Sequence, residues 1–319
     1  MELLLAGYEI IEQQPGLDGI YKAIELPGRI CYGSQDKICE GSARKFVEDI
    51  LMKNNHGAPM EHGTVYLKCP QNVWKKYVNN KYSYTTSKPI YEAAYDCDRP
   101  FTLYDYYVTT NFRVLFENGW LDDLQYRCEP TEGHVRRIQV RFTIDRFTGE
   151  EFLRHRPNSF NRESTRFVNF CKKKFGNGSI KYILPIWLHD RQDIVEWDAT
   201  RPLQDFCKDI AYGLDEGIFT DIDYWVFALK SCEYSYNNLI RLGWVPEQAR
   251  TVLPCAINSP LIVTASMPDW IHFFNLRAIG TTGKPHPQAK ELAEPLMHEF
   301  LHRGYIKNDD GALKMNEYE

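Results

Sequence analysis

The strongest constraint on the fold is an alternation of apolar and polar residues near the middle of the chain. From Ile138 to Ile144 every second residue is apolar, which is typical of a strand with one buried face. Thr148-Gly149-Glu150-Glu151 follows with the pattern of a capping box and predicts a helix that runs into Arg154. We expect an α+β fold, in which a central sheet is flanked by helices.

Similar patterns predict the other elements of one domain that spans residues 1–319. Ser266, with Pro268 and Asp269 in the first turn, predicts the start of a helix through Arg277. The polar tail from Lys307 is expected to fray. The other predicted strands are Leu3–Ile11, Val65–Cys69, Ile180–Pro185 and Leu261–Ala265, and the other predicted helices are Ser42 to about Asn55, Leu203–Phe219, Ile222–Leu242, Pro246–Arg250 and Pro287–Gly304.

Four arginines lie within the thirteen residues from Arg154 to Arg166, together with His155 and two serines. We call this range the arginine-rich segment. Guanidinium groups bind phosphate and carboxylate in a bidentate manner, so the segment predicts a site for a phosphorylated ligand. An arginine-rich loop is more often a solvated turn. Because the net charge of the chain is −5, however, this local concentration needs a local reason.

The composition argues against several other classes of protein. An overall negative charge gives no support for nucleic-acid binding. The sequence has no run of about eighteen apolar residues and no basic leader, so neither a membrane span nor a signal peptide is expected. The nine cysteines never form a Cys-x-x-Cys pair, which favours reduced thiols and a cytoplasmic location.

Several separated motifs together resemble the flavin-dependent thymidylate synthase family. Their order along the chain agrees with that family, and the resemblance covers about residues 42–70 and 138–303. The motifs are Pro59-x-Glu61-His62, Arg154-His155-Arg156-x7-Ser164-x-Arg166, Ala249-Arg250-x-x-Leu253-Pro254, and His272-Phe273-Phe274-x-Leu276-Arg277 followed by Gln288.

The resemblance implies a reaction, its cofactors and an assembly. It implies methylation of dUMP to dTMP with methylenetetrahydrofolate as carbon donor, FAD as hydride carrier and NADPH as reductant. It also implies a homotetramer with flavins at the subunit interfaces. The partners are then small molecules, with no nucleic acid and no membrane. In this family the flavin carries the redox work, while the protein supplies orientation and electrostatics.

The resemblance also assigns roles to individual residues. Arg277 matches the arginine that contacts the pyrimidine and favours its N3-deprotonated form, and it is our predicted catalytic residue. At Glu151 the family commonly has Gln, and at Arg162 it often has Glu or Gln. The predicted dUMP-binding residues are Glu151, Arg154, Glu163, Ser164, Arg166, Arg250 and Arg277, and the predicted FAD-binding residues are His56, Arg154, His155, Arg156, Arg162 and His272.

Residues 70–134 have no equivalent in the shorter members of that family. The segment is rich in tyrosine, and its apolar content is too high for a disordered linker. We therefore expect an insertion that packs on the main domain, with a helix over about Thr102–Asn118.

Three alternatives remain. His298-Glu299-x-x-His302 has the pattern of a zinc peptidase helix, although a third ligand is not evident and we expect no metal. A catalytically inactive homologue would keep a nucleotide or flavin site and fail in turnover. Pro254-Cys255 resembles the nucleophile motif of the unrelated thiol-dependent thymidylate synthases, but a buried free cysteine is the commoner state.

Overall fold

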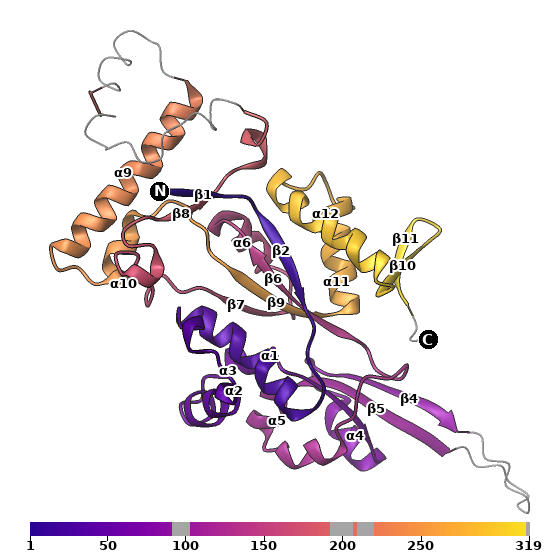
Figure 1. Cartoon of the computed structure of the whole chain (residues 1–319). Helices are drawn as coiled ribbons and strands as arrows, with labels where there is room; N and C mark the ends of the chain where they lie inside the picture. Colours follow the sequence, from indigo (N-terminus) through magenta and orange to yellow (C-terminus); the bar gives the residue numbers. More distant parts are fainter. Residues whose placement is uncertain (91–102, 192–206, 209–219, 317–319) are drawn as a thin grey trace, which may run out of the picture.

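The computed structural model describes residues 1–90, 103–191, 207–208 and 220–316. At its centre lies a four-stranded sheet in the order β2-β6-β9-β7, with every neighbouring pair antiparallel. The sheet runs through the middle of Figure 1. Its strands are β2 (Gly7–Ile11), β6 (Arg137–Thr143), β9 (Leu261–Ser266) and β7 (Ser159–Arg162). The expected α+β class and the strand predicted from the alternation are both confirmed.

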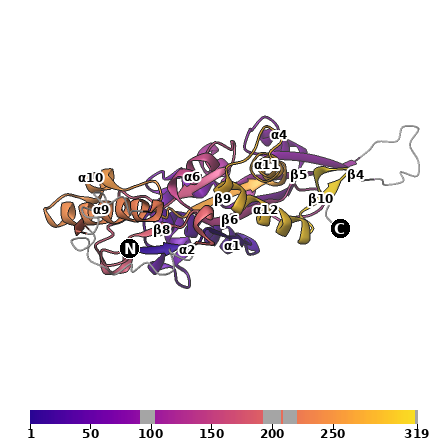
Figure 2. The same ribbon diagram turned by 90° about the horizontal axis from the view of Figure 1, so that it is seen from above.

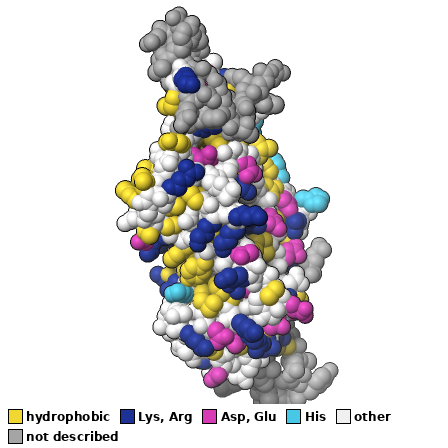
Figure 3. Space-filling view, turned by 60° about the vertical axis from the view of Figure 1, so that its left-hand side comes forward, with side chains coloured by type: hydrophobic (Ala, Val, Ile, Leu, Met, Phe, Trp, Pro, Cys, Tyr) yellow, Lys and Arg dark blue, Asp and Glu magenta, His cyan; other side chains and the backbone are white. Residues whose placement is uncertain are grey.

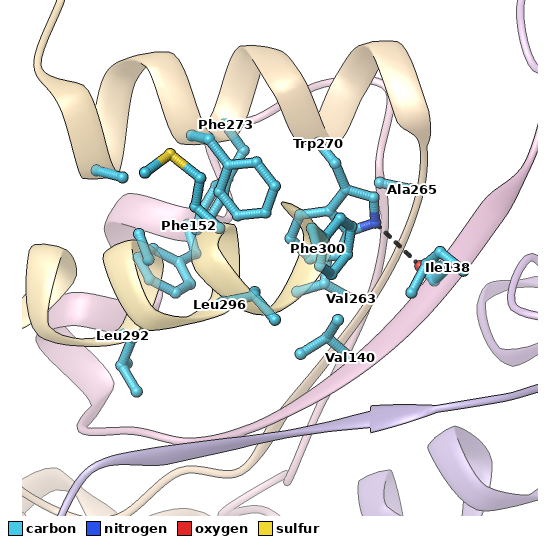
Figure 4. Close-up of a cluster of buried hydrophobic side chains, with 14 of the residues drawn as sticks. Ile138, Val140, Phe152, Val263, Ala265, Trp270, Phe273, Leu292, Leu296 and Phe300 are labelled. Atoms are coloured by element: carbon cyan, nitrogen blue, oxygen red, sulfur yellow. Dashed lines mark hydrogen bonds between the residues drawn. The ribbon is translucent and has the colours of Figure 1, made fainter. Parts of the chain in front are cut away.

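Helices α11 (Met267–Phe274) and α12 (Pro287–His302) cover one face of this sheet. Figure 4 shows the resulting core, in which Phe152, Trp270, Phe273 and Phe300 lie over the strand residues. The indole Nε1 of Trp270 donates to the carbonyl oxygen of Ile138 at 3.1 Å, so the only polar group of this buried ring is satisfied. Packing of the apolar strand face therefore fixes the helix that ends near Arg277.

The opposite face of the sheet is polar and is covered by α1 (Gly16–Cys31). The amide of Gln139 donates to the Ala23 carbonyl at 3.1 Å, and that of Asn161 donates to the Pro27 carbonyl at 3.2 Å. The sequence did not predict this helix, because glycines and an internal proline give it poor intrinsic helix propensity. Gly28 is needed for close packing, since a Cβ there would lie 2.5 Å from the Phe46 ring.

A second, three-stranded antiparallel sheet contains β3 (Thr64–Cys69), β5 (Leu103–Asn111) and β4 (Tyr84–Ile90), with β5 in the middle. The helix predicted over about Thr102–Asn118 is wrong for most of its length. Its first part is strand β5, rich in the aromatic and β-branched residues that favour strands. The helix α5 (Phe112–Asn118) begins only after Asn111, whose side chain accepts from the Val114 amide.

The two ends of the chain also differ from their predictions. The predicted strand Leu3–Ile11 is broken into β1 (Glu2–Leu4), which pairs in parallel with β8 (Lys181–Ile183), and β2 in the central sheet. The tail that we expected to fray forms the hairpin β10 (Ile306–Asp309) and β11 (Ala312–Met315). Buried Ile306 anchors this hairpin to the main core.

The remaining helices lie around these sheets, and the molecule is elongated (Figure 2). Helices α9 (Asp221–Arg241) and α10 (Pro246–Ala249) lie at one end, and the β4–β5 hairpin lies at the other. The predicted helix Leu203–Phe219 falls outside the described residues except for 207–208. No helix in the described part of the chain is long and apolar enough to cross a membrane. The other helices are α2 (Ser42–Lys45), a π-helix (Phe46–Met52), α3 (Gly57–Met60), α4 (Gln71–Tyr77), α6 (Arg146–Phe152), α9 (Asp221–Arg241), α10 (Pro246–Ala249) and a π-helix (Asn275–Ile279), with 3₁₀ turns at Gln35–Lys37, Leu121–Tyr126, Lys173–Phe175, Ile186–Leu188 and Arg250–Val252.

Candidate active site

Arg277 is the centre of the most tightly bonded polar cluster among the predicted site residues. Its Nε donates to Nε2 of His155 at 3.0 Å, its Nη1 donates to Oε2 of Glu151 at 2.6 Å, and its Nη2 donates to the Glu151 carbonyl at 3.0 Å. The side chains of Arg277 and Glu151 are each 18% exposed. Three fixed contacts at a partly open position hold the guanidinium in one orientation.

Aromatic packing brings the two halves of this cluster together. Phe152, at the end of α6, packs edge to face on Phe273 of α11, with ring centroids 4.9 Å apart. Phe273 also packs on the ring of His155 at 5.1 Å. Arg277 lies on the π-helical turn that continues α11, and such turns are frequent at functional sites. The apolar core therefore determines where Glu151, His155 and Arg277 meet.

The start of α6 differs from the predicted capping box. The N-cap is Asp145 rather than Thr148, since Oδ1 of Asp145 accepts from the Thr148 amide at 2.8 Å. Its other oxygen accepts from Nε2 of Gln288 at 3.2 Å. A carboxylate can serve both donors at once, whereas a threonine hydroxyl has a single oxygen. Gln288 thus ties α12 to the helix that carries Glu151.

His155 is neutral in this environment. Burial lowers the pKa of His155 to about 4, and the nearby charges of Arg277 and His272 act in the same direction. Because its Nε2 accepts from Arg277, the proton lies on Nδ1, which is buried and has no hydrogen-bond partner in the described part of the chain. The exposed ring of His272 lies 5.8 Å from the His155 ring. The cluster therefore contains one buried N–H donor that no described residue satisfies.

Arg154 and Arg156 lie on either side of His155 and are both exposed. No described carboxylate forms an ion pair with either guanidinium, and the same holds for Arg250. In the face shown in Figure 3, Lys and Arg side chains gather across the middle, among hydrophobic ones. Unpaired guanidinium groups next to a structured loop are suited to an anionic ligand.

A second basic group surrounds the start of α6 and includes a residue that the sequence analysis missed. Burial is the main cause that lowers the pKa of Arg146. The positive charge of Arg162 lowers it further, and the charge of Arg250 contributes to the same shift. Arg162, a predicted FAD residue, donates instead to Oε1 of Glu150 at 2.8 Å. Arg146 carries no motif, so nothing in the sequence marked it as a member of this group.

The other predicted residues form a separate group on the α1 side of β7. The Ser164 amide donates to the Cys31 carbonyl at 3.2 Å, and Arg166 lies 3.6 Å from Oε2 of Glu247. Nδ1 of His56 lies 2.8 Å from the Tyr32 hydroxyl. The Tyr32 ring packs on Phe167, beside Arg166, at 5.6 Å.

This group is not bonded to the Arg277 cluster. Along the chain, the four-residue strand β7 lies between the two groups and spans roughly 13 Å. Among the described residues, no hydrogen bond or ion pair links Ser164 or Arg166 to Glu151, His155 or Arg277. One chain therefore presents two parts of the predicted site without joining them.

Glu163 lies at the end of β7, between these groups. Burial raises the pKa of its carboxyl to about 7, and the nearby charges of Arg141 and Lys181 oppose the shift. Its amide donates to the Pro260 carbonyl at 3.0 Å, which fixes the backbone but leaves the predicted role in dUMP binding untested.

A cavity of about 500 Å³ lies between α1 and the polar face of the central sheet. His62, Arg137, Gln139 and Thr264 are among its lining residues, and none of the predicted dUMP or FAD residues lines it. Cavity size alone would point to this location, whereas the arginines and the buried imidazole donor point to the other face. We place the candidate active site at Arg277 because its chemistry is the more specific of the two.

The structure gives no support to the zinc alternative. His298 and His302 are exposed on α12, and Oε1 of Glu299 accepts from Nε of Arg303 at 2.9 Å. Over the described ranges, no three His, Cys, Asp or Glu side chains converge as metal ligands. Cys255 is an exposed free thiol rather than a buried one.

The comparison with known families agrees with the resemblance seen in the sequence. The family described as thymidylate synthase complementing protein matches residues 130–302. The match covers more than half of the chain and includes the arginine-rich segment, Arg250 and Arg277. The chain therefore belongs to this family, which is that of the flavin-dependent thymidylate synthases.

Other comparisons add less. No curated protein matches the sequence. Two solved structures of a UMP/dUMP methylase, PolB from Streptomyces cacaoi, are similar to the chain. The one bound with 5-Br dUMP is 17% identical, with 95% of this chain and 93% of that chain covered and a TM-score of 0.38. The one bound with 5-Br UMP is 16% identical, with 94% and 91% covered and the same TM-score. A TM-score of this size does not place individual residues.

Proposed function

We propose that the protein methylates dUMP at C5 to give dTMP, with methylenetetrahydrofolate as carbon donor, FAD as hydride carrier and NADPH as reductant, in the cytoplasm. The observation that carries the proposal is the fixed guanidinium of Arg277 in a family member. Uracil C5 is a poor nucleophile and must gain electron density before it can attack the folate methylene. A preorganised cation beside the ring favours the electron-rich, N3-deprotonated form.

Arg277 is suited to that task. Three of the five N–H donors of a guanidinium are used by His155 and Glu151, which leaves two for a substrate. Because the protein contacts already fix its orientation, little reorganisation is needed when charge develops on the base. Neutral His155 supports this role by accepting a bond from Arg277 without adding a competing positive charge.

The residues beside Arg277 fit a flavin nucleotide. The buried Nδ1–H of His155 has no partner among the described residues, and the exposed guanidinium groups of Arg154 and Arg156 can bind the diphosphate of FAD. When bound, FAD would supply the reducing equivalents that convert the transferred methylene into a methyl group. His272 and His56 remain proposed flavin contacts.

We propose that dUMP phosphate is bound by Ser164 and Arg166 from one subunit, while Arg277 comes from another. The separation of the two groups within one chain supports a shared site, in keeping with the homotetramer that the family resemblance implies. The ion pair between Arg166 and Glu247 is solvent-exposed on both sides, and such pairs contribute little stability. A phosphate can therefore displace Glu247.

Absorbance spectroscopy of the purified protein tests the flavin part of the proposal. Flavin bands should be present, or should appear on reconstitution with FAD, and anaerobic NADPH should bleach them at a rate that depends on dUMP. A colourless protein that cannot be reconstituted would contradict the proposal.

Tritium release from C5-labelled dUMP separates the active enzyme from the inactive homologue. The proposed enzyme should release tritium when folate and NADPH are both present. Flavin and dUMP binding without tritium release would instead favour the inactive homologue, for which Glu151 and Arg162 would be the first residues to examine.

A further inference from the structure

The cavity between α1 and the polar face of the central sheet is not used by the proposed function. Its volume is about 500 Å³, within the range of small-molecule sites in proteins. Its walls come from the end of β2, the start of α1, strand β3 and residues 127–130, and its floor comes from β6 and β9. An occupant of this cavity is therefore a second ligand, separate from dUMP and FAD.

Arginines outnumber carboxylates around this cavity. The charged residues that line it are Arg127, Arg136, Arg137, Glu12 and Glu129. Oε1 of Glu12 accepts from Nη1 of Arg303 at 2.9 Å. Oε1 of Glu129 accepts from the Gly16 amide at 3.3 Å. Both carboxylates are thus bonded outside the set of lining arginines, and no ion pair joins either of them to one of these arginines.

Arg137, the first residue of β6, meets only neutral oxygens. Its Nη2 donates to the Glu61 carbonyl at 3.2 Å and to the Ser159 hydroxyl at 3.1 Å. Its Nη1 makes longer contacts, at 3.4 Å to the Thr64 hydroxyl and at 3.5 Å to the Thr110 carbonyl. Burial is the main cause that lowers the pKa of Arg137. Because a cation removed from water is costly without a counter-ion, an anion in the cavity would stabilise it.

The neighbouring side chains on the cavity floor supply no negative charge. Burial lowers the pKa of His62 to about 3, and the charge of Arg137 acts in the same direction, so this imidazole is neutral. Gln139 follows Arg137 by two residues on β6 and therefore lies on the same face of the strand. Its amide nitrogen donates to the Ala23 carbonyl, while its Oε1 is buried and has no partner among the described residues. The floor thus combines a cation with an unused acceptor.

We propose that this cavity binds a small organic anion, phosphorylated or carboxylated, that also carries a hydroxyl or amino donor. The anionic group is bound by Arg137 from the floor and by Arg127 from the solvent side, where Arg127 is exposed and forms no ion pair with a described residue. The donor of the ligand serves Gln139. The inference does not rest on the proposed function, because neither Arg277 nor a flavin takes part in it.

Calorimetric titrations of the purified full-length protein test the inference with three probes. Glycerol 3-phosphate carries a phosphate and hydroxyl donors, and malate carries carboxylates and a hydroxyl donor. Glycerol has the hydroxyl donors without the charge and is the neutral control. Binding of only one of the two anions would identify phosphate or carboxylate as the preferred group.

Two substitutions with matched controls test the position of the site. Ala23 lines the cavity, so Ala23→Leu narrows the space without removing a polar group. Its control is Ala228→Leu, at an exposed position of α9, a helix that contributes no lining residue. Arg127→Gln removes one cation from the cavity, and Arg241→Gln removes an exposed cation from the end of α9. Thermal unfolding would verify that each variant is folded.

At least one of the two anions should bind the wild type once per chain, whereas glycerol should not. Ala23→Leu should weaken this binding about tenfold or more, because the added methyl groups occupy the ligand's space. Arg127→Gln should weaken it about twofold to fivefold, as expected for one exposed charged contact, and both controls should leave it unchanged. Binding of neither anion, equal binding of glycerol, or an unchanged affinity in folded Ala23→Leu overturns the inference. If Ala23→Leu does not fold, an unchanged affinity in Arg127→Gln overturns it.

Parallel titrations with dUMP separate this inference from the proposed function. Ala23→Leu should bind dUMP like the wild type, and Arg166→Ala should bind the anion like the wild type. Loss of anion binding in Arg166→Ala, with retention in Ala23→Leu, would assign the anion to the proposed dUMP site and overturn the inference alone. A wild type that binds the anion in the cavity but does not bind dUMP would contradict the proposed function and support the inference.

Discussion

Replacing Phe152 by alanine should destabilise the protein and disturb the site at the same time. The ring is 1% exposed and packs edge to face between Phe142, at 5.2 Å, and Phe273, at 4.9 Å. Loss of a fully buried phenyl ring leaves a cavity and costs about 3–5 kcal/mol of unfolding free energy. Because each edge-to-face pair adds about 0.5–1.5 kcal/mol, we expect a value in the upper half of that range.

The same substitution should weaken nucleotide binding under conditions where the variant is still folded. Phe152 directly follows Glu151 in the chain, and Phe273 supports the ring of His155 at 5.1 Å. Loss of the ring therefore frees both partners of Arg277 to move. Phe147→Ala is the matched control, since Phe147 belongs to the same helix and is 58% exposed. It should change the unfolding free energy by no more than about 0.5 kcal/mol.

Urea unfolding followed by far-UV circular dichroism would measure both variants. The experiment needs two protein concentrations, because the apparent stability of an oligomer depends on the concentration of its subunits. A loss of less than about 1 kcal/mol for Phe152→Ala, or a loss equal to that of Phe147→Ala, would refute the packing argument.

Three further predictions concern the chemistry. Cys255→Ala should keep tritium release from C5-labelled dUMP within about tenfold of wild type, because no thiol is needed as a nucleophile; complete loss in a folded, flavin-loaded variant would reverse this assignment. Glu163 should make stability fall as pH rises from about 4.5 to 7, because its folded-state pKa of about 7 lets the folded chain keep a proton that the unfolded chain releases. Glu163→Gln should flatten that dependence in unfolding titrations, and an unchanged profile would contradict the assignment. Co-refolded Arg166→Ala and Arg277→Ala subunits should recover about a quarter of wild-type turnover if sites are shared between subunits, whereas the average of the two single variants would place both arginines in one site within one chain.

The local sequence pattern was sufficient to predict those strands and helices whose apolar residues recur at regular intervals or whose first residue is a recognisable cap. The strand Arg137–Thr143 and the helix Met267–Phe274 were predicted because alternation and a serine cap are visible within a few residues. Helix α1 was missed because its stability comes from contacts with the sheet, such as the bonds to Gln139 and Asn161. The first part of Thr102–Asn118 was mistaken for helix because its pairing with β3 and β4 is a long-range property.

The residue types of the candidate site could be proposed from the sequence, but their geometry could not. Family motifs identified Arg154, His155 and Arg277, yet they do not show that Arg154 is exposed while its neighbour His155 is buried. That difference arises because the helix ends at Phe152, so the next residues leave the helical register. Arg146 carries no motif and becomes visible only when the fold brings it near Arg162 and Arg250.

The arginines of the candidate site differ in whether the folded chain already provides partners for their guanidinium groups. Arg277 is partly buried and compensated by a carboxylate, a carbonyl and an imidazole, so it is held in place before any ligand arrives. Arg154, Arg156 and Arg250 lack such partners within the described residues, and like charges that approach one another without a counter-ion destabilise a fold. In the proposed site, an anionic ligand supplies the counter-charge that these guanidinium groups lack. The proposed site therefore combines a single fixed cation for the reacting base with several uncompensated cations for the phosphates.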